Sequence, residues 1–211
     1  MEVSDPVRRL CVAVAADGPD RGRDRPAHPP AHRPTYRSAY RSARQQVSQV
    51  VRQVARAVED ASMAAGLDQA TLQILPAGVL VVLNSGVNEA RVVTDLTREL
   101  RNALWRRNQR HADSRLRCRI SYHQGLVRLT DEGFEGQAVT VAGDLCASAA
   151  LRAALAEDPR HDLAMIISGR LLDDLAYPES DGLHRHHFRP VTVPTGGRSI
   201  LAYIYSHDQP T

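Results

Sequence analysis

The chain has 211 residues, of which 43% are hydrophobic and 4% aromatic, and its formal net charge is +3 at pH 7. This length and composition exclude a largely disordered chain and predict one domain over residues 1–211 with an aliphatic core. The small basic excess does not require a nucleic acid or an anionic surface as partner. All 27 basic residues are arginine, which we interpret as the bacterial-type codon bias of a GC-rich genome.

Features that would direct the chain to a membrane or out of the cell are absent from the sequence pattern. The longest unbroken apolar runs, such as 79–83 and 163–167, are far shorter than the roughly 20 residues of a membrane-spanning helix. The first residues lack a basic region followed by an apolar core, so we expect no secretory signal. Cys11, Cys118 and Cys146 stand in apolar contexts without CxxC spacing. We therefore expect a cytoplasmic protein with reduced, structural cysteines and no membrane partner.

The first expected element is a buried strand over Arg9–Ala16, which ends at a turn around Asp17-Gly18-Pro19. Residues 19–37 contain five prolines among arginines and histidines, and this composition predicts a flexible insertion loop. The loop and the residues after it carry arginines that could contact an anion or a nucleic acid: Arg21, Arg23, Arg25, Arg33, Arg37 and Arg41.

Beyond the loop, segments with helical and strand periodicity alternate. Helices are expected over residues 47–61, 92–104, 141–153 and 168–175, the last capped by Ser168. Strands are expected over residues 72–75, 78–83, 116–122, 163–167 and 199–205. The short joint at Pro76-Ala77 makes two of these strands neighbours. We therefore predict an α/β (α+β) fold with a mixed, largely antiparallel sheet covered by helices.

Four strings in this order match a known pattern. They are residues 14–18 (Val-Ala-Ala-Asp-Gly), 73–78 (Gln-Ile-Leu-Pro-Ala-Gly), 119–125 (Arg-Ile-Ser-Tyr-His-Gln-Gly) and 136–145 (Gly-Gln-Ala-Val-Thr-Val-Ala-Gly-Asp-Leu). Across nearly the whole chain, the sequence resembles the catalytic domain of class III adenylate and guanylate cyclases. The resemblance implies the ferredoxin-like nucleotidyl cyclase fold. Its backbone-shaping glycines match at Gly18, Gly78, Gly125 and Gly136.

The residues that perform the chemistry in that family do not match. Active members hold two divalent ions on two aspartates, and the resemblance places these at Ala15 and Ala77, whose methyl groups cannot ligate an ion. The Asn and Arg that act on the transition state fall on Thr140 and Asp144. A carboxylate at position 144 would repel a triphosphate where the family has a cation.

The two base-selecting positions of the family fall on Gln73 and Gly133. Neither the Lys and acidic pair for adenine nor the Glu and Cys pair for guanine is present. We therefore expect a catalytically inactive, pseudoenzyme domain that acts in signalling as a regulatory or protein-interaction module, without a metal or other cofactor. Active relatives build their site across two subunits, so the resemblance implies a homodimer, a heterodimer with a related domain, or docking on an unknown protein.

Two alternatives stay open. In the first, a shifted alignment lets Asp17 and Asp144 hold magnesium or manganese in a divergent cyclase. In the second, the arginine-rich loop binds a nucleotide or a nucleic acid, although arginines on a flexible loop are usually just solvated.

Four histidines have the chemistry of a metal ligand or a general base, but we expect them to be structural. His184, His186 and His187 lack a supporting acidic or Cys partner, and we interpret them as part of a polar loop rather than a metal site. His123 has the chemistry of a general base, but it lies at a strand position without a catalytic task in the family. We expect it to be structural.

Overall fold

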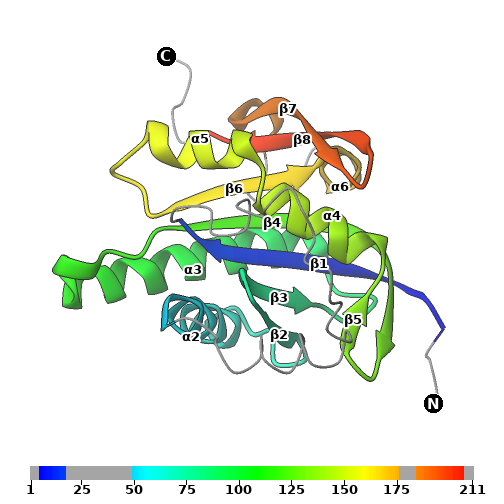
Figure 1. The fold of residues 1–211 in the computed structure, drawn as a ribbon, viewed down its shortest axis with the longest axis horizontal. Coiled ribbons are helices and arrows are strands. Elements are labelled where there is room, and N and C mark those ends of the chain that lie inside the picture. The colour runs from blue at the N-terminus through cyan, green and yellow to red at the C-terminus, as the bar shows by residue number, and fades with distance from the viewer. Residues whose placement is uncertain (1–4, 18–48, 176–183, 207–211) are drawn as a thin grey trace, which may run out of the picture.

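A computed structural model describes residues 5–17, 49–175 and 184–206. The insertion loop predicted for residues 19–37 lies outside the described residues, and so do all six arginines assigned to anion contact. The described residues form a mixed α+β structure in which one sheet carries helices on both faces (Figure 1). The predicted fold class is confirmed.

Within the described residues the sheet has eight strands. They are β1 (Val7–Ala16), β2 (Thr71–Leu75), β3 (Gly78–Val82), β4 (Cys118–Thr130), β5 (Gly133–Glu135), β6 (Leu163–Ser168), β7 (Phe188–Thr195) and β8 (Arg198–Tyr205). Their order is β2-β3-β1-β4-β6-β8-β7, and β5 pairs with the end of β4. Among the described pairings, β4 with β6 is parallel and the others are antiparallel, as a mixed and largely antiparallel sheet requires.

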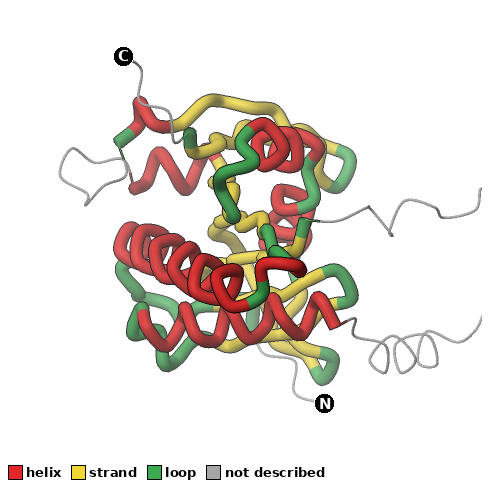
Figure 2. Tube along the Cα trace, turned by 90° about the vertical axis from the view of Figure 1, so that its left-hand side faces the viewer, coloured by secondary structure: helices red, strands yellow, loops and turns green. Residues whose placement is uncertain are grey.

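Helices cover the two faces of this sheet. They are α2 (Gln49–Ala64), α3 (Glu89–Arg110), α4 (Gln137–Cys146), α5 (Ala149–Glu157) and α6 (Gly169–Leu175). The helices α2 and α3 lie side by side on one face, and α4 and α5 pack on the other (Figure 2). Short 3-10 turns at Ala112–Ser114 and Arg185–His187 precede β4 and β7.

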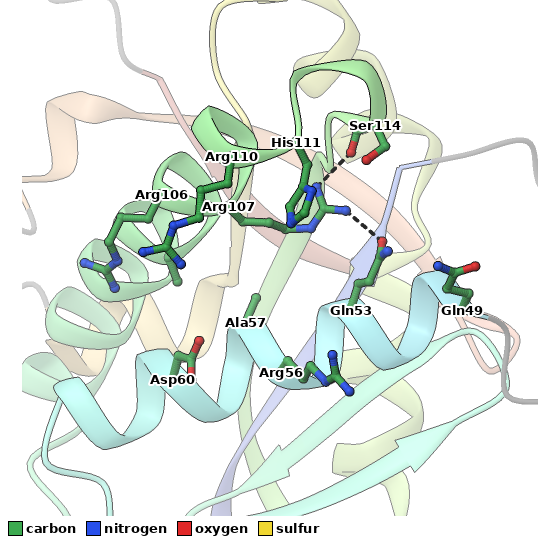
Figure 3. Close-up of a pocket in the computed structure, with 11 residues that line it drawn as sticks. Gln49, Gln53, Arg56, Ala57, Asp60, Arg106, Arg107, Arg110, His111 and Ser114 are labelled. Carbon is green, nitrogen blue, oxygen red and sulfur yellow. Dashed lines mark hydrogen bonds between the residues drawn. The ribbon is translucent and has the colours of Figure 1, made fainter.

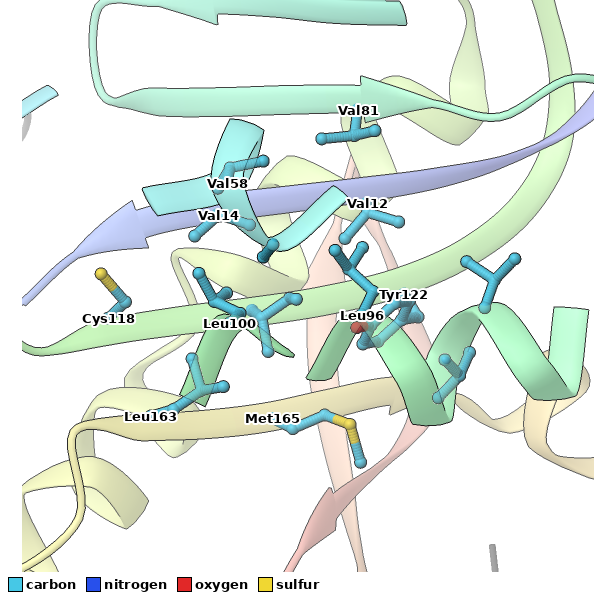
Figure 4. Packing of buried hydrophobic residues seen from close by; sticks show 14 of the residues in the cluster. Val12, Val14, Val58, Val81, Leu96, Leu100, Cys118, Tyr122, Leu163 and Met165 are labelled. Carbon is cyan, nitrogen blue, oxygen red and sulfur yellow. The ribbon is translucent and has the colours of Figure 1, made fainter. Parts of the chain in front are cut away.

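Successive side chains of β1 point to opposite faces of the sheet and pack in two different core clusters. Val12 and Val14 pack beneath α2 and α3, whereas Cys11 and Ala13 face α4. The larger cluster also holds Tyr122, which is fully buried and whose hydroxyl lies 2.8 Å from Thr97 Oγ1 (Figure 4). The small side chains on the other face allow α4 to lie close to the strands.

The end of β1 lies unusually close to the turn between β2 and β3. A Cβ atom on Gly78 would lie 2.2 Å from the carbonyl oxygen of Val14 and 3.1 Å from the Cα of Ala15. Residue 78 must therefore be glycine for β3 to pair with β1 in this register, in which Val14 lies opposite Val79.

Most predicted elements are present, with three corrections. The strand expected over 116–122 begins at Cys118 and continues to Thr130, because residues 123–127 pair with β1 and residues 128–130 pair with β5. The helix expected over 141–153 is two helices, since Ser148 accepts a hydrogen bond from Leu151 N and starts α5. Ser168 was expected to cap the next helix, but its hydroxyl lies 2.9 Å from His123 Nδ1 instead.

The cysteine prediction is confirmed. Cys11, Cys118 and Cys146 are all free and buried. Burial raises the pKa of the Cys11 thiol to about 12 and that of Cys146 to about 11. Such thiols stay protonated at neutral pH and pack as small apolar side chains.

One segment is apolar enough to resemble a membrane span. Within residues 137–157, a window of 18 residues has a mean hydropathy of 1.4, which is high enough for a membrane-spanning helix. The search for unbroken apolar runs did not detect this segment, because polar residues interrupt it. In the fold this segment is α4 and α5, which bend apart at Ser148. Both helices bury apolar side chains such as Leu145 and Leu151 against the sheet, as core helices do.

The contact at Gly78 predicts an effect on stability. Gly78→Ala should lower the free energy of unfolding by about 1–3 kcal/mol or more, because the added methyl group collides with the backbone of β1. Gly143→Ala is the matched control, since Gly143 lies within α4 with open space around it and should gain about 0.5–1 kcal/mol. Urea unfolding of both variants measures the difference, and equal changes would contradict the proposed contact.

Candidate functional site

The structure places the two predicted metal positions next to each other. Ala15 lies near the end of β1, and Ala77 lies in the turn before Gly78, whose backbone touches β1 at Ala15. Ala77 is exposed and Ala15 is half-buried. The fold thus brings together two positions that are far apart in the sequence, at an edge that solvent can reach.

The residues at this edge do not fit a pair of divalent ions. Magnesium and manganese take oxygen ligands, usually carboxylates, and Ala15 and Ala77 supply only methyl groups and backbone. Within residues 5–17, 49–175 and 184–206, no group of three or more His, Cys, Asp or Glu side chains is placed to hold a metal.

The two carboxylates of the alternative metal site are held by different elements. Asp17 follows β1, where its backbone N–H donates to the Arg117 carbonyl and its carboxylate lies 3.9 Å from the Arg117 guanidinium. Asp144 lies on α4 and accepts a hydrogen bond from the backbone of Gly196, in the turn between β7 and β8. Burial raises the pKa of Asp144, and the bond from Gly196 partly offsets this rise.

Thr140 and Asp144, the positions of the family's Asn and Arg, lie one helical turn apart on α4. Thr140 is exposed and lines a hollow of about 330 Å³ with residues of the β7–β8 turn, including Gly196. Both positions thus adjoin the β7–β8 turn, while Ala15 and Ala77 adjoin the β2–β3 turn. The two halves of the predicted site contact different elements in one chain.

The predicted base-selecting positions meet directly. Gln73 on β2 accepts a hydrogen bond of 2.9 Å at Oε1 from the backbone N–H of Phe134. Gly133 has φ 116°, and a Cβ there would lie 2.6 Å from the Gln73 amide. The Gln73 side chain therefore fills the space beside residue 133 and is already bonded to the backbone. In this arrangement it does not present its amide to a base.

A buried arginine that the sequence reasoning did not single out connects the elements around Ala15. Arg119 lies opposite Ala15 across the β1–β4 pairing and is 6% exposed. Its Nη1 donates to the Cys146 carbonyl at 3.0 Å and its Nη2 to the Ala16 carbonyl at 3.1 Å. It thereby attaches the C-terminal end of α4 to the end of β1, where a cation also suits the helix dipole. No distinctive sequence signal marked this role, because polar residues alternate with apolar ones along the strand.

His123 is a half-buried side chain beside Ser168. Burial, together with the positive charges of Arg170 and Arg8, lowers the pKa of His123 from 6.5 to about 4. Its Nδ1 lies 2.9 Å from the Ser168 hydroxyl, which links β4 to the end of β6. At neutral pH the imidazole is therefore neutral and bonded between two strands, and this geometry fits the structural role predicted for it.

The three histidines before β7 contact one another through their rings: His184 stacks on His186, and His187 lies edge-on to both. The ring centroids of His186 and His187 are 4.1 Å apart, and His187 lies edge-on to Tyr205 at 5.8 Å. These are ring contacts at the start of β7. They agree with the interpretation of the segment as a polar loop leading into the last strands.

Comparison with solved structures identifies the fold. The chain superposes on the guanylyl cyclase Cya2 with a TM-score of 0.59 and 15% identity, over 97% of this chain and 94% of that one. The structure shares the nucleotidyl cyclase fold. An adenylyl cyclase CyaB from P. aeruginosa gives a TM-score of 0.54 and 11% identity, over 98% of both chains. An adenylate/guanylate cyclase/hydrolase from Silicibacter pomeroyi gives 0.51 and 18%, over 97% and 100%.

No protein-family model and no curated protein sequence matches the chain. At these identities the likeness to cyclase structures shows the fold, which the strings around Gly78, Gly125 and Gly136 had implied. The assignment of Ala15, Ala77, Thr140, Asp144, Gln73 and Gly133 to family positions stays a prediction.

The lowered pKa of His123 predicts a pH dependence of stability. A native pKa of about 4 against 6.5 in the unfolded chain means that the unfolded state binds the extra proton first. The stabilisation that neutral His123 gives to the folded state is therefore fully present above pH 6.5, and it is lost as the pH falls toward 4. His123→Asn, which keeps a polar group near Ser168, should flatten the stability curve between these pH values. Urea unfolding at several pH values measures it, and an unchanged slope would contradict the assignment.

Proposed function

We propose that this chain is a non-catalytic domain of the nucleotidyl cyclase fold that works as a dimeric regulatory or protein-interaction module in the cytoplasm. The observation that carries the proposal is the contact between Gly78 and Ala15. Ala77 precedes Gly78 in the chain, so its closeness to Ala15 supports the alignment. Both are alanine, so the arrangement lacks the carboxylates that would bind ions there.

The other degenerate positions support the same conclusion. The Gln73 amide is bonded to the Phe134 backbone in the space where a base-reading side chain would act. Asp144 adds a negative charge where the family has a cation, although its pKa is raised by burial. Each change removes or reverses an interaction with a nucleotide. The contacts that determine the backbone shape, at Gly78 and Gly136, are retained.

The surface around the β4–β5 hairpin supports dimerisation. Leu126 and Leu129 on β4 are 57% and 49% exposed, and a subunit that covers the hairpin would remove this apolar surface from water. Leu126 borders a hollow of about 570 Å³ that also includes Gln137 and Val141 of α4. These two α4 residues line the hollow beside Thr140 as well. If this surface were the dimer interface, the part of α4 that carries Thr140 and Asp144 would face the second subunit. Active relatives likewise build their sites from two subunits.

The first experiment tests catalysis and metal binding together. The purified chain incubated with ATP or GTP and magnesium or manganese should form no cyclic nucleotide, and manganese binding followed by electron paramagnetic resonance should be absent. The double variant Ala15→Asp/Ala77→Asp should gain manganese binding, because two carboxylates are then adjacent. The single variant Ala77→Asp is the control with one carboxylate.

Cyclic product from the unmodified chain would overturn this proposal and favour a divergent cyclase. Asp17→Ala would then be expected to abolish the activity. Failure of the double variant to bind manganese, with its fold intact, would instead overturn the placement of positions 15 and 77.

The second experiment tests the dimer. Sedimentation equilibrium should show a dimer. The double variant Leu126→Glu/Leu129→Glu should raise its dissociation constant by about tenfold or more, since each subunit would bury two charges in the interface. The matched control is Val50→Glu/Met63→Glu, which adds the same charge on exposed apolar positions of α2. A monomer for the unmodified chain, or equal effects of both variants, would contradict a dimer through the β4–β5 hairpin.

A further inference from the structure

A hollow of about 490 Å³ lies between α2 and α3 (Figure 3). Its floor includes Ala57 and Ala103, which are buried and have only methyl groups. Larger side chains at these two positions would close the space between the helices. The volume falls in the range of about 300–1,000 Å³ that small-molecule sites occupy.

The lining of this hollow is strongly basic. Arg56 from α2 and three arginines from α3 line it, together with one carboxylate, that of Asp60 (Figure 3). The α3 arginines are Arg106, Arg107 and Arg110. Their spacing places all three on one face of the helix. Like charges this close repel one another in the free protein, and an anion in the hollow would relieve that repulsion.

One of these arginines is already held in place. Arg107 Nη2 donates to Gln53 Oε1 at 2.9 Å, and Arg107 Nη1 donates to the Ser114 carbonyl at 2.8 Å. Its guanidinium thus spans α2 and the segment after α3 without a carboxylate partner. Among the described residues, Arg56, Arg106 and Arg110 make no hydrogen bond or ion pair with one another or with a neighbour. Three guanidinium groups are therefore available around one fixed group.

We propose that the hollow between α2 and α3 binds a small ligand that carries at least two phosphate groups. The planar guanidinium fork matches phosphate oxygens in pairs, and arginines on both walls can hold more than one phosphate. Gln49, Gln53 and His111 add polar groups for the rest of such a ligand. A concave lining favours a small ligand over a nucleic acid, whose backbone needs a basic stripe along the surface.

This site is independent of the degenerate cyclase positions. The helices α2 and α3 pack on the sheet face of Val12 and Val14, whereas Ala15 packs against the cluster on the α4 face. The six loop arginines of the nucleic-acid hypothesis are not part of it. Ligand binding here requires neither a divalent ion nor catalysis.

The test is titration calorimetry with inorganic tripolyphosphate, without divalent ions and at one fixed salt concentration. Arg106→Gln/Arg110→Gln should weaken binding at least tenfold. The matched control Arg91→Gln/Arg98→Gln removes the same charge from exposed positions of α3 that pair with Asp95 outside the hollow, and it should change affinity less than threefold. Ala103→Met keeps every charge but fills the floor, and it should also weaken binding. Thermal unfolding of each variant verifies that it is folded.

Three results would overturn the proposal. One is equal weakening by the hollow and control variants, which would indicate a general charge effect. Another is orthophosphate binding as tightly as tripolyphosphate, which would exclude a ligand with several phosphates. The third is a short DNA duplex that binds more tightly than tripolyphosphate and loses affinity with Arg106→Gln/Arg110→Gln, which would make the hollow part of a nucleic-acid surface. None of these results depends on the outcome of the cyclase assay.

Discussion

The contact between Gly78 and the backbone of Val14 determines how the sheet is assembled around β1. No side chain fits between these two segments, so β3 can pair along β1 only if its first residue is glycine. On its other edge, β1 pairs with β4 from Val7 to Ala16. Because β1 is bonded on both sides, the positions of the β2–β3 turn and of α4 follow from it. The same contact sets Ala15 beside Ala77.

Backbone shape and chemistry are separable in this chain, for a physical reason. Glycines such as Gly78 and Gly136 are required because any Cβ would collide with neighbouring backbone, so replacing them would damage the fold itself. Positions 15 and 77 carry no such requirement, since both residues already have a Cβ atom, Ala15 being half-buried and Ala77 exposed. The residue types at positions 15 and 77 can therefore differ between proteins that keep this architecture. This asymmetry is the basis for proposing a pseudoenzyme.

The buried Arg119 and the arginines between α2 and α3 have different roles in the structure. Arg119 is buried and its guanidinium is bonded to backbone carbonyls at the ends of β1 and α4, so it has a structural task. The arginines between α2 and α3 line an open hollow, and only Arg107 among them is bonded within it. An arginine count or a net charge cannot distinguish these cases. The distinction depends on what each guanidinium contacts.

The sequence by itself determined the fold class, most elements and the buried, reduced cysteines, because apolar periodicity, turn residues and glycine spacing are local signals. It also identified the strings that resemble the cyclase domains. Only the tertiary structure decided that β4 continues past residue 122 along β1 and that Ser168 bonds His123, since both depend on partners distant in the chain. The contact of Gln73 with the residues at 133–134 and the hollow between α2 and α3 likewise arise from packing between separate elements, for which a single sequence carries no local signal.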